Sequence, residues 1–293
     1  APNSVAMLAL WWLSAAVSKL PESRVATTEA CDSAELPAPA VVVGGATIEP
    51  QISETVELRD GRTVALRTLH AELQLTYAHG LVAAEELEAL VRLAESRGGF
   101  RRSPLRRQRS DGEIKDDIRN SSSCPLLWPM VYAGRTHEVA AAANGAALLE
   151  ELSLATRISE RVADLFSRSG MPTTAAHVEP LQLVRYQASE LFGPHHDYHE
   201  SPSSSVQGEQ RSFTVLLFGS TLPPGSGGET RFPLLDVSVS PRTGDALIWA
   251  NLLDDGTPNV RSLHEGRPPA SGEKLAVNVW VADRPFDSSS DLE

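Results

Sequence analysis

The stretch from Leu191 to His199 contains residue types at a spacing that could hold a metal ion. It reads Leu-Phe-Gly-Pro-His-His-Asp-Tyr-His, and one residue separates His195 from Asp197. In an extended segment, residues i and i+2 point to the same face, so an imidazole nitrogen and a carboxylate oxygen would lie side by side. These two donors can hold a divalent metal if a third ligand arrives from elsewhere in the chain. His-rich tripeptides also occur in loops that bind no metal, and at this point that alternative stays open.

Two histidines with one carboxylate are the ligand set of non-haem Fe(II) oxygenases, which leaves coordination positions open for substrate and oxygen. The neighbouring histidines fit that set less well. His196 would point to the opposite face of an extended segment, so we expect it not to bind metal. In an extended segment His199 would point to the same face as His195, but it lies beyond Asp197. We expect its side chain to be solvated or to contact the metal ligands without binding the metal.

The segment from Lys274 to Val281 alternates between apolar and other residues, which predicts a half-buried strand. The apolar face consists of Leu275, Val277, Val279 and Val281, and the other face includes Lys274, Asn278 and Trp280. If the apolar face packs against other structure, Lys274 faces a cavity and needs an anionic partner, because an unpaired buried charge is costly. The alternative is a solvated lysine at the end of a strand.

From Leu183 to Trp280 the chain carries short motifs in a definite order. They are Leu183-Val184-Arg185-Tyr186, His195-x-Asp197, Arg211-Ser212-Phe213-Thr214, Gly227-Gly228-Glu229-Thr230-Arg231-Phe232, Gly244-Asp245-Ala246-Leu247, His264, Lys274 and Trp280. The interval from Tyr186 to His195 is nine residues, and that from His264 to Lys274 is ten. In this order and spacing the chain resembles the 2-oxoglutarate- and Fe(II)-dependent dioxygenases of the prolyl 4-hydroxylase type, over about residues 76–285.

The resemblance implies an oxidative site with Fe(II), 2-oxoglutarate and O2 as cofactors, and ascorbate as the expected reductant. The implied iron ligands are His195, Asp197 and His264. The far carboxylate of 2-oxoglutarate would meet Lys274, a compact cation suited to a dry pocket. Tyr186 could donate its hydroxyl to the same carboxylate, although it could equally be an ordinary core tyrosine. Thr230 and Trp280 would line this cosubstrate pocket, and Glu229 is expected to face outward or to orient the ligands.

The leading substrate implied by the resemblance is peptidyl proline, hydroxylated to 4-hydroxyproline with succinate and CO2 as co-products. Expected substrate contacts are Arg211, Arg119, Phe192 and Trp280. Arg119-Asn120-Ser121-Ser122 resembles the family's Arg-Thr-Ser loop over the peptide site, with Asn in place of Thr. Phe192 and Phe218 stand where peptide-hydroxylating relatives usually carry Tyr, and a site built around a lost hydroxyl would discriminate strongly.

Two other functions remain open. The first is a dioxygenase of the same fold that acts on another side chain or on a small molecule. The second is a non-catalytic binding module that keeps the fold without turnover. Retention of His195, Asp197, His264 and Lys274 argues against the second function, because a module without turnover does not need all four.

Secondary-structure patterns place helices before strands. Leu87, Leu90, Val91 and Ala94 recur at helical spacing before Gly98-Gly99, and a stripe within residues 136–168 consists of Leu154, Ile158, Val162, Leu165 and Phe166. Strands are expected at 180–187, 211–219, 229–240, 245–250, 258–264 and 274–282. This order predicts an α+β fold, with a double-stranded β-helix (jelly roll) core braced by N-terminal helices.

The remaining segments suggest four regions. Residues 1–40 hold an apolar stretch from Val5 to Val17, which suits a signal or anchor remnant or else a buried or amphipathic helix. Residues 18–47 resemble a linker in composition. Residues 41–75 form a β-hairpin lead-in, with turn residues Asp60-Gly61. The dioxygenase region, 76–285, includes an Arg-rich polar segment at 101–123 that we expect to be either a solvated loop or a mobile lid, and 286–293 form a polar tail.

Composition limits the partners and the compartment. The 293 residues carry 26 Lys and Arg against 38 Asp and Glu, a net charge of -12, which argues against a nucleic-acid partner. Membrane association is expected only through the N-terminal segment. The two cysteines, Cys31 and Cys124, are no disulfide framework, and a single bridge between them stays open. The family resemblance favours the secretory pathway or endoplasmic reticulum without excluding the cytoplasm, and the oligomeric state stays undetermined.

Overall fold

The computed structural model describes residues 41–49, 51–103, 107–108, 114–115, 119–201 and 205–287. The apolar stretch from Val5 to Val17 and Cys31 lie outside the described residues, as does most of the expected polar tail. None of the helices in the described part of the chain has the length and apolar character needed to cross a bilayer.

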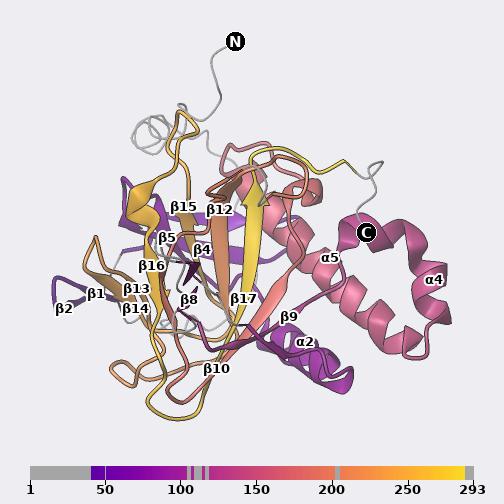
Figure 1. Ribbon diagram of the computed structural model, residues 1–293. Helices are drawn as coiled ribbons and strands as arrows, with labels where there is room; N and C mark the ends of the chain where they lie inside the picture. The colour runs from indigo at the N-terminus through magenta and orange to yellow at the C-terminus, as the bar shows by residue number, and fades with distance from the viewer. Residues whose placement is uncertain are drawn as a thin grey trace, which may run out of the picture.

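Two antiparallel sheets face each other and form the jelly roll (Figure 1). In spatial order, the larger sheet contains β3 (Glu54–Glu57), β4 (Thr63–His70), β5 (Leu75–His79), β15 (Ala246–Ala250), β12 (Arg211–Phe218), β17 (Glu273–Ala282), β10 (Gln182–Gln187), β9 (Ser122–Pro125) and β6 (Arg101–Arg102). The smaller sheet contains β11 (Phe192–His195), β16 (His264–Gly266), β13 (Thr230–Phe232), β14 (Val237–Val239), β1 (Val41–Val43) and β2 (Ala46–Ile48). The predicted α+β jelly roll is confirmed.

The larger sheet is buried on both faces, which explains the apolar runs of its central strands β12 and β15. One face packs against the smaller sheet through a core that includes Phe218, Phe232 and Trp249. The other face of the sheet contributes Val277, Val279 and Val281 to the core formed with the helices. The apolar face predicted for β17 therefore packs against other structure, as expected.

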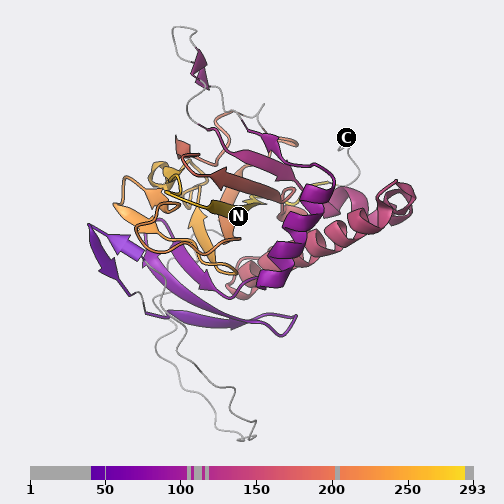
Figure 2. The same ribbon diagram turned by 90° about the horizontal axis from the view of Figure 1, so that it is seen from below.

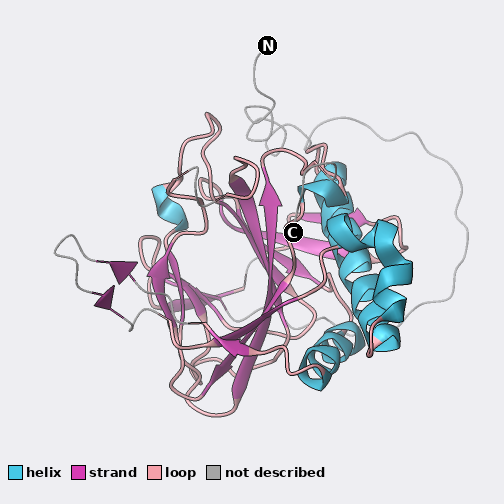
Figure 3. Cartoon of the chain, turned by 45° about the vertical axis from the view of Figure 1, so that its right-hand side comes forward, coloured by secondary structure: helices cyan, strands magenta, loops and turns pink. Residues whose placement is uncertain are grey.

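Helices cover the outer face of the larger sheet (Figure 3). The main ones are α2 (Ala84–Ser96) and α5 (Gly145–Arg168), with α3 (Pro129–Tyr132) and α4 (Thr136–Ala141) before α5. Every residue of the predicted stripe on α5 is at most 4% exposed. Both predicted helical segments are therefore confirmed, and they brace the sheet that carries the site.

The segment before residue 76 belongs to both sheets. The predicted hairpin around Asp60-Gly61 forms as β3 and β4, and β5 continues the larger sheet by pairing with β15. The linker prediction for 18–47 is wrong from residue 41 onward, because Val41 is fully buried and pairs with Val239 of β14. Residues 18–40 lie outside the described part.

Two predicted strands differ from those observed. Residues 229–240 form a hairpin, because Pro233 lacks a backbone N–H and Asp236 adopts a φ of 51° in the turn between β13 and β14. Residues 258–264 mostly form a turn and the 3-10 helix Val260–Ser262, at whose start the side chain of Asn259 accepts the N–H of Arg261. The strand itself, β16, begins only at His264.

The polar segment 101–123 is partly incorporated into the fold. β6 and β9 pair within the larger sheet, and the side chains of Arg119 and Ser121 are 8% and 0% exposed. The prediction of a solvated loop or a mobile lid is wrong for the two ends of this segment, because pairing with neighbouring strands orders them. The short β7 (Arg107–Gln108) and β8 (Ile114–Lys115) pair with each other, as Figure 2 shows.

Candidate metal and cosubstrate site

Pairing of two short strands brings the predicted metal ligands together. In the smaller sheet, His195 of β11 lies opposite His264 of β16, with ring centroids 4.2 Å apart. Asp197 follows β11, and its carboxylate oxygens lie 3.7 Å from His195 Nε2 and 3.6 Å from His264 Nε2. One donor atom from each residue lies within 4.8 Å of the others. The three side chains could therefore hold one metal ion, as the sequence predicted.

Hydrogen bonds on the far side of each ligand set its orientation. The Nδ1 atoms of His195 and His264 each lie 2.8 Å from a backbone carbonyl oxygen, those of Gly193 and Ser262. Because a carbonyl only accepts, Nδ1 carries the hydrogen in both rings and Nε2 keeps a free lone pair.

The carboxylate of the group is oriented from the larger sheet. Asp197 Oδ2 accepts a hydrogen bond of 2.7 Å from the hydroxyl of Thr214, which in turn accepts one of 2.9 Å from the amide of Asn251. Residues of the larger sheet therefore fix in place a carboxylate that follows a strand of the smaller sheet. Thr214 was not predicted as a site residue, because its contact with Asp197 joins segments of different sheets and no sequence pattern around Thr214 indicates it.

Burial and mutual charge set the protonation of the group. Burial lowers the pKa of His264 and lowers that of His195 to about 3. Burial alone would raise the pKa of Asp197, but His264, His195, Arg211 and the Thr214 hydrogen bond outweigh it and bring the pKa to about 2. At neutral pH the group therefore presents two neutral imidazoles and one carboxylate, the protonation states that bind a metal cation.

A buried lysine lies near the metal group, and its charge contributes to the lowered pKa of His264. Lys274 is 1% exposed, and its Nζ donates a 3.3 Å hydrogen bond to the hydroxyl of Thr230. Burial lowers the lysine pKa to about 8. Among the residues that the structure describes, no carboxylate lies within ion-pair distance of this ammonium group. It therefore fits the carboxylate of an incoming ligand, and the alternative of a solvated lysine at a strand end is wrong.

Tyr186 lies beside that ammonium group. The tyrosine pairs with Lys274 across β10 and β17, and Lys274 Nζ is 5.4 Å from the centroid of its ring. A Cβ placed on Gly266 would come within 3.3 Å of the Tyr186 hydroxyl, so glycine leaves this oxygen room. Thr230 lies opposite Gly266 in the smaller sheet. Tyr186, Thr230 and Lys274 thus converge where a carboxylate could bind.

An aromatic ring covers His195. Phe192 stacks on its imidazole, and the guanidinium carbon of Arg119 lies 4.5 Å from the centroid of the Phe192 ring. Arg119 donates to Ser121 at 2.9 Å and to Gln182 at 3.5 Å. Burial lowers the pKa of Arg119, and no described carboxylate forms an ion pair with it. Both predicted substrate contacts therefore lie next to the metal group.

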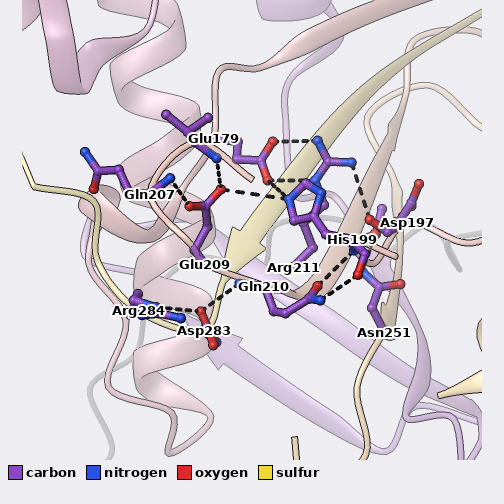
Figure 4. A network of polar contacts seen from close by, with 12 residues as sticks. Glu179, Asp197, His199, Gln207, Glu209, Gln210, Arg211, Asn251, Asp283 and Arg284 are labelled. Atoms are coloured by element: carbon purple, nitrogen blue, oxygen red, sulfur yellow. Dashed lines mark hydrogen bonds and ion pairs between the residues drawn. The ribbon is translucent and has the colours of Figure 1, made fainter. Parts of the chain in front are cut away.

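Arg211 and Trp280, the other predicted substrate contacts, lie together. The Arg211 guanidinium carbon is 3.7 Å from the centroid of the Trp280 ring. Two nitrogens of Arg211 donate to the carboxylate of Glu179 at 2.6 Å each, and a third lies 3.4 Å from the backbone oxygen of Asp197 (Figure 4). Arg211 is held by this ion pair, which the sequence did not predict. Three of its five N–H groups are engaged, which leaves two for a ligand.

The remaining expectations concern two histidines, Phe218 and the cysteines. His196 lies outside the metal group, with Nε2 3.1 Å from the backbone oxygen of Val260, as expected. His199 is not solvated, because its side chain is only 10% exposed. Phe218 is fully buried in the core between the sheets, beside Tyr77, so its replacement of a tyrosine does not line a substrate groove. Cys124 is buried, and Cys31 is outside the described residues, so the bridge stays open.

Comparison with known proteins gives a consistent result. The family described as the 2OG-Fe(II) oxygenase superfamily matches residues 181–282, which contain all three candidate metal ligands, Tyr186, Thr230 and Lys274. Prolyl 4-hydroxylase 1 of Arabidopsis thaliana is 27% identical over 219 residues, covering 70% of this chain and 68% of the relative. Prolyl 4-hydroxylase 13 of the same plant is 30% identical over 157 residues, covering 48% of this chain and about half, 51%, of the relative.

A solved structure of a viral collagen prolyl hydroxylase from Paramecium Bursaria Chlorella virus-1, with 2OG, aligns over 71% of this chain and 95% of that one. Its sequence identity is 18% and its TM-score 0.49. The family's cofactors are Fe(II), 2-oxoglutarate and O2, and the neutral imidazoles, the carboxylate and the buried ammonium group found here fit them. The family match covers the strands that carry these groups, and over residues 181–282 the chain is similar to the 2OG-Fe(II) oxygenase superfamily.

Proposed function

We propose that this dioxygenase hydroxylates peptidyl proline to 4-hydroxyproline, with succinate and CO2 as co-products. The observation that carries the proposal is that two groups lie near each other between the sheets. One is the group of His195, Asp197 and His264, in the protonation states that bind a metal cation. The other is the buried ammonium group of Lys274, which forms no ion pair with a carboxylate of the described residues. The choice of proline is supported by the relatives, which are named prolyl 4-hydroxylases.

In this proposal, His195, Asp197 and His264 hold Fe(II). The bound iron supplies the oxidation of a C–H bond by O2, coupled to the breakdown of 2-oxoglutarate. The chain's own contribution is orientation. The Nδ1–H bonds to Gly193 and Ser262 aim the two imidazole lone pairs at one point, and the Thr214 hydroxyl fixes the carboxylate.

Lys274, Tyr186 and Thr230 bind the far carboxylate of 2-oxoglutarate in this proposal. The ammonium group supplies the counter-charge, and the two hydroxyls supply directed hydrogen bonds, an arrangement that binds a carboxylate strongly in a dry site. Trp280 is assigned to the wall of the site, where Arg211 packs on its ring.

The peptide is assigned to the side of the iron group lined by Arg119, Phe192, Arg211 and Trp280. Proline suits such a site, because its fixed φ lowers the entropy that a peptide loses on binding. The aromatic faces of Phe192 and Trp280 offer apolar surface, and the guanidinium groups offer donors for peptide carbonyl oxygens.

The test is succinate formation by purified protein with Fe(II), 2-oxoglutarate and ascorbate, with and without proline-rich peptides. A matched peptide with alanine in place of proline is the control. We expect succinate to rise only with the proline peptide, and mass spectrometry to find one added oxygen atom on proline. If no peptide changes the rate of succinate formation, the proline assignment is overturned.

A same-fold dioxygenase with another substrate is the second candidate, and one observation favours it. Phe192 is 8% exposed and touches a proposed iron ligand, so a hydroxyl that peptide-hydroxylating relatives usually carry here is missing at the site itself. In that case, turnover would require a non-proline side chain or a small molecule.

Ascorbate as reductant and a secretory-pathway location belong to the same proposal. The location is supported by the resemblance and by the apolar stretch from Val5 to Val17. Fluorescent fusions with and without residues 1–40 test it, and an unchanged cytoplasmic signal for both would contradict it.

A further inference from the structure

A second group of metal-binding side chains lies beside the first. It consists of Glu179, His199 and Glu209, and one donor atom of each lies within 4.8 Å of the others. Glu179 precedes β10, and His199 and Glu209 both lie in the connection from β11 to β12, so two connecting segments meet here. Figure 4 shows the imidazole of His199 facing both carboxylates. The proposed reaction uses none of these three side chains as a ligand.

The nitrogen at the centre of this group lacks a hydrogen bond. The His199 side chain is nine-tenths buried, and its Nε2 has no hydrogen-bond partner among the described residues. This nitrogen lies 4.0 Å from Glu179 Oε1 and 3.8 Å from Glu209 Oε1, too far for hydrogen bonds. Buried polar atoms rarely stay unsatisfied, so the arrangement points to a ligand between the three groups.

Both carboxylates are already held in place by donors on their other sides. Glu179 accepts the two short hydrogen bonds from Arg211. Glu209 accepts backbone N–H groups of Val206 at 2.9 Å and of Gln207 at 2.6 Å. A carboxylate has about four lone-pair positions, so each retains capacity for a metal ion. Carboxylate ligands in metal sites are commonly oriented by hydrogen bonds of this kind.

Spacing and charge agree with a cation. The separations of 3.8 and 4.0 Å are close to the 3.6 and 3.7 Å found between Asp197 and the histidines of the first group. The cluster contains two carboxylates, and Arg211 is paired with one of them, Glu179. With a neutral imidazole, the cluster and Arg211 together carry one excess negative charge. One nitrogen and two oxygen donors form a ligand set that Zn(II) accepts.

We propose that Glu179, His199 and Glu209 form a second metal site, which binds a divalent cation of the Zn(II) type in a structural role. The ion would tie the connection that carries His199 and Glu209 to the start of β10. That connection joins Asp197 to Arg211, so the bound ion would fix the positions of these two residues relative to each other. The proposal does not depend on which substrate the enzyme hydroxylates.

Zn(II) titration of the metal-free full chain tests the proposal, with equilibrium dialysis and metal analysis as the readout. We expect two equivalents in the wild type and one in Asp197→Ala, which lacks a ligand of the first group only. His199→Leu should bind one equivalent, and the double variant none. His196→Ala is the matched control, since this neighbouring histidine belongs to neither group, and it should keep both equivalents.

Co(II) substitution in the Asp197→Ala background adds a spectroscopic readout. Absorption bands from nitrogen and oxygen ligation should appear and should be lost in the double variant with His199→Leu. Glu209→Gln provides a second variant if circular dichroism shows that His199→Leu is unfolded. A single Zn(II) equivalent in the wild type would overturn the proposal, as would a second equivalent that survives both His199→Leu and Glu209→Gln.

Discussion

Phe192 lies face to face on the imidazole of His195, with ring centroids 3.4 Å apart and ring planes inclined by 10°. Only one ring nitrogen of His195 is anchored by a hydrogen bond, so the stacked ring is a second restraint on the orientation of a proposed iron ligand. Arg119 covers the opposite face of Phe192, which makes a three-layer stack at the edge of the site.

Removal of this ring should weaken metal binding without abolishing it. An aromatic pair contributes about 0.5–1.5 kcal/mol beyond buried area, so Phe192→Ala should raise the Fe(II) concentration for half-maximal activity roughly three- to tenfold. Phe192→Tyr keeps the stack and is the control, with little expected change. An unchanged Fe(II) requirement in Phe192→Ala would show that the Gly193 hydrogen bond suffices.

Loss of any proposed iron ligand should abolish turnover and leave the fold largely intact. His195→Ala, Asp197→Ala and His264→Ala each remove one of three donors, and a site with open positions has no spare protein ligand. Succinate formation is the measurement, circular dichroism checks the fold, and His196→Ala is the control. A variant with near-normal succinate formation would exclude that residue from the iron group.

Lys274→Ala should chiefly weaken 2-oxoglutarate. Removing one partner of a buried charge pair costs on the order of 3–5 kcal/mol, so the 2-oxoglutarate concentration for half-maximal rate should rise a hundredfold or more. Thr230→Val is a graded control, because a single neutral hydrogen bond contributes only about 0.5–1.5 kcal/mol. If both variants have the same small effect, the ammonium group is not the counter-charge.

The affinity for 2-oxoglutarate should fall as the pH rises through the lysine pKa. Burial places that pKa at about 8 in the free protein, and a bound carboxylate favours the charged form and raises it. Below pH 8 the ammonium group is present before binding. Above it, binding must take up a proton, and affinity should fall by up to about tenfold per pH unit.

Calorimetric titration of the metal-loaded protein without oxygen, from about pH 7 to pH 9.5, measures this dependence. In Lys274→Ala, the affinity for 2-oxoglutarate should not fall with pH over this range. A flat profile in the wild type would mean that Lys274 keeps its proton throughout this range and that burial lowers its pKa less than stated.

The parts of the site that sequence could predict are those with local signals. The period-two alternation of β17 correctly placed Lys274 on the face opposite Val277 and Val279, and the His195-x-Asp197 spacing identified two donors before any family was considered. His264 required the family resemblance, because nothing in its neighbourhood distinguishes a ligand from another strand-end histidine.

The contacts that sequence missed depend on the register between distant strands. The Thr214 hydrogen bond to Asp197 and the ion pair between Glu179 and Arg211 join residues 17 and 32 positions apart through sheet packing. The hairpin within 229–240 was predicted as one strand, although Pro233 and Asp236 mark its turn. Side-chain pairing of this kind leaves no periodicity to read.

Arg119 should bind the peptide rather than the cosubstrate. It is buried without a described carboxylate, and it lies over Phe192, which stacks on the proposed iron ligand His195. Hydrogen bonds to charged groups contribute about 1.5–3 kcal/mol, so Arg119→Gln should raise the peptide KM roughly ten- to hundredfold. The 2-oxoglutarate dependence of succinate formation should stay unchanged. Arg185→Gln is the matched control, since that arginine pairs with Glu273 instead. A variant that loses 2-oxoglutarate affinity and keeps its peptide KM would assign Arg119 to the cosubstrate.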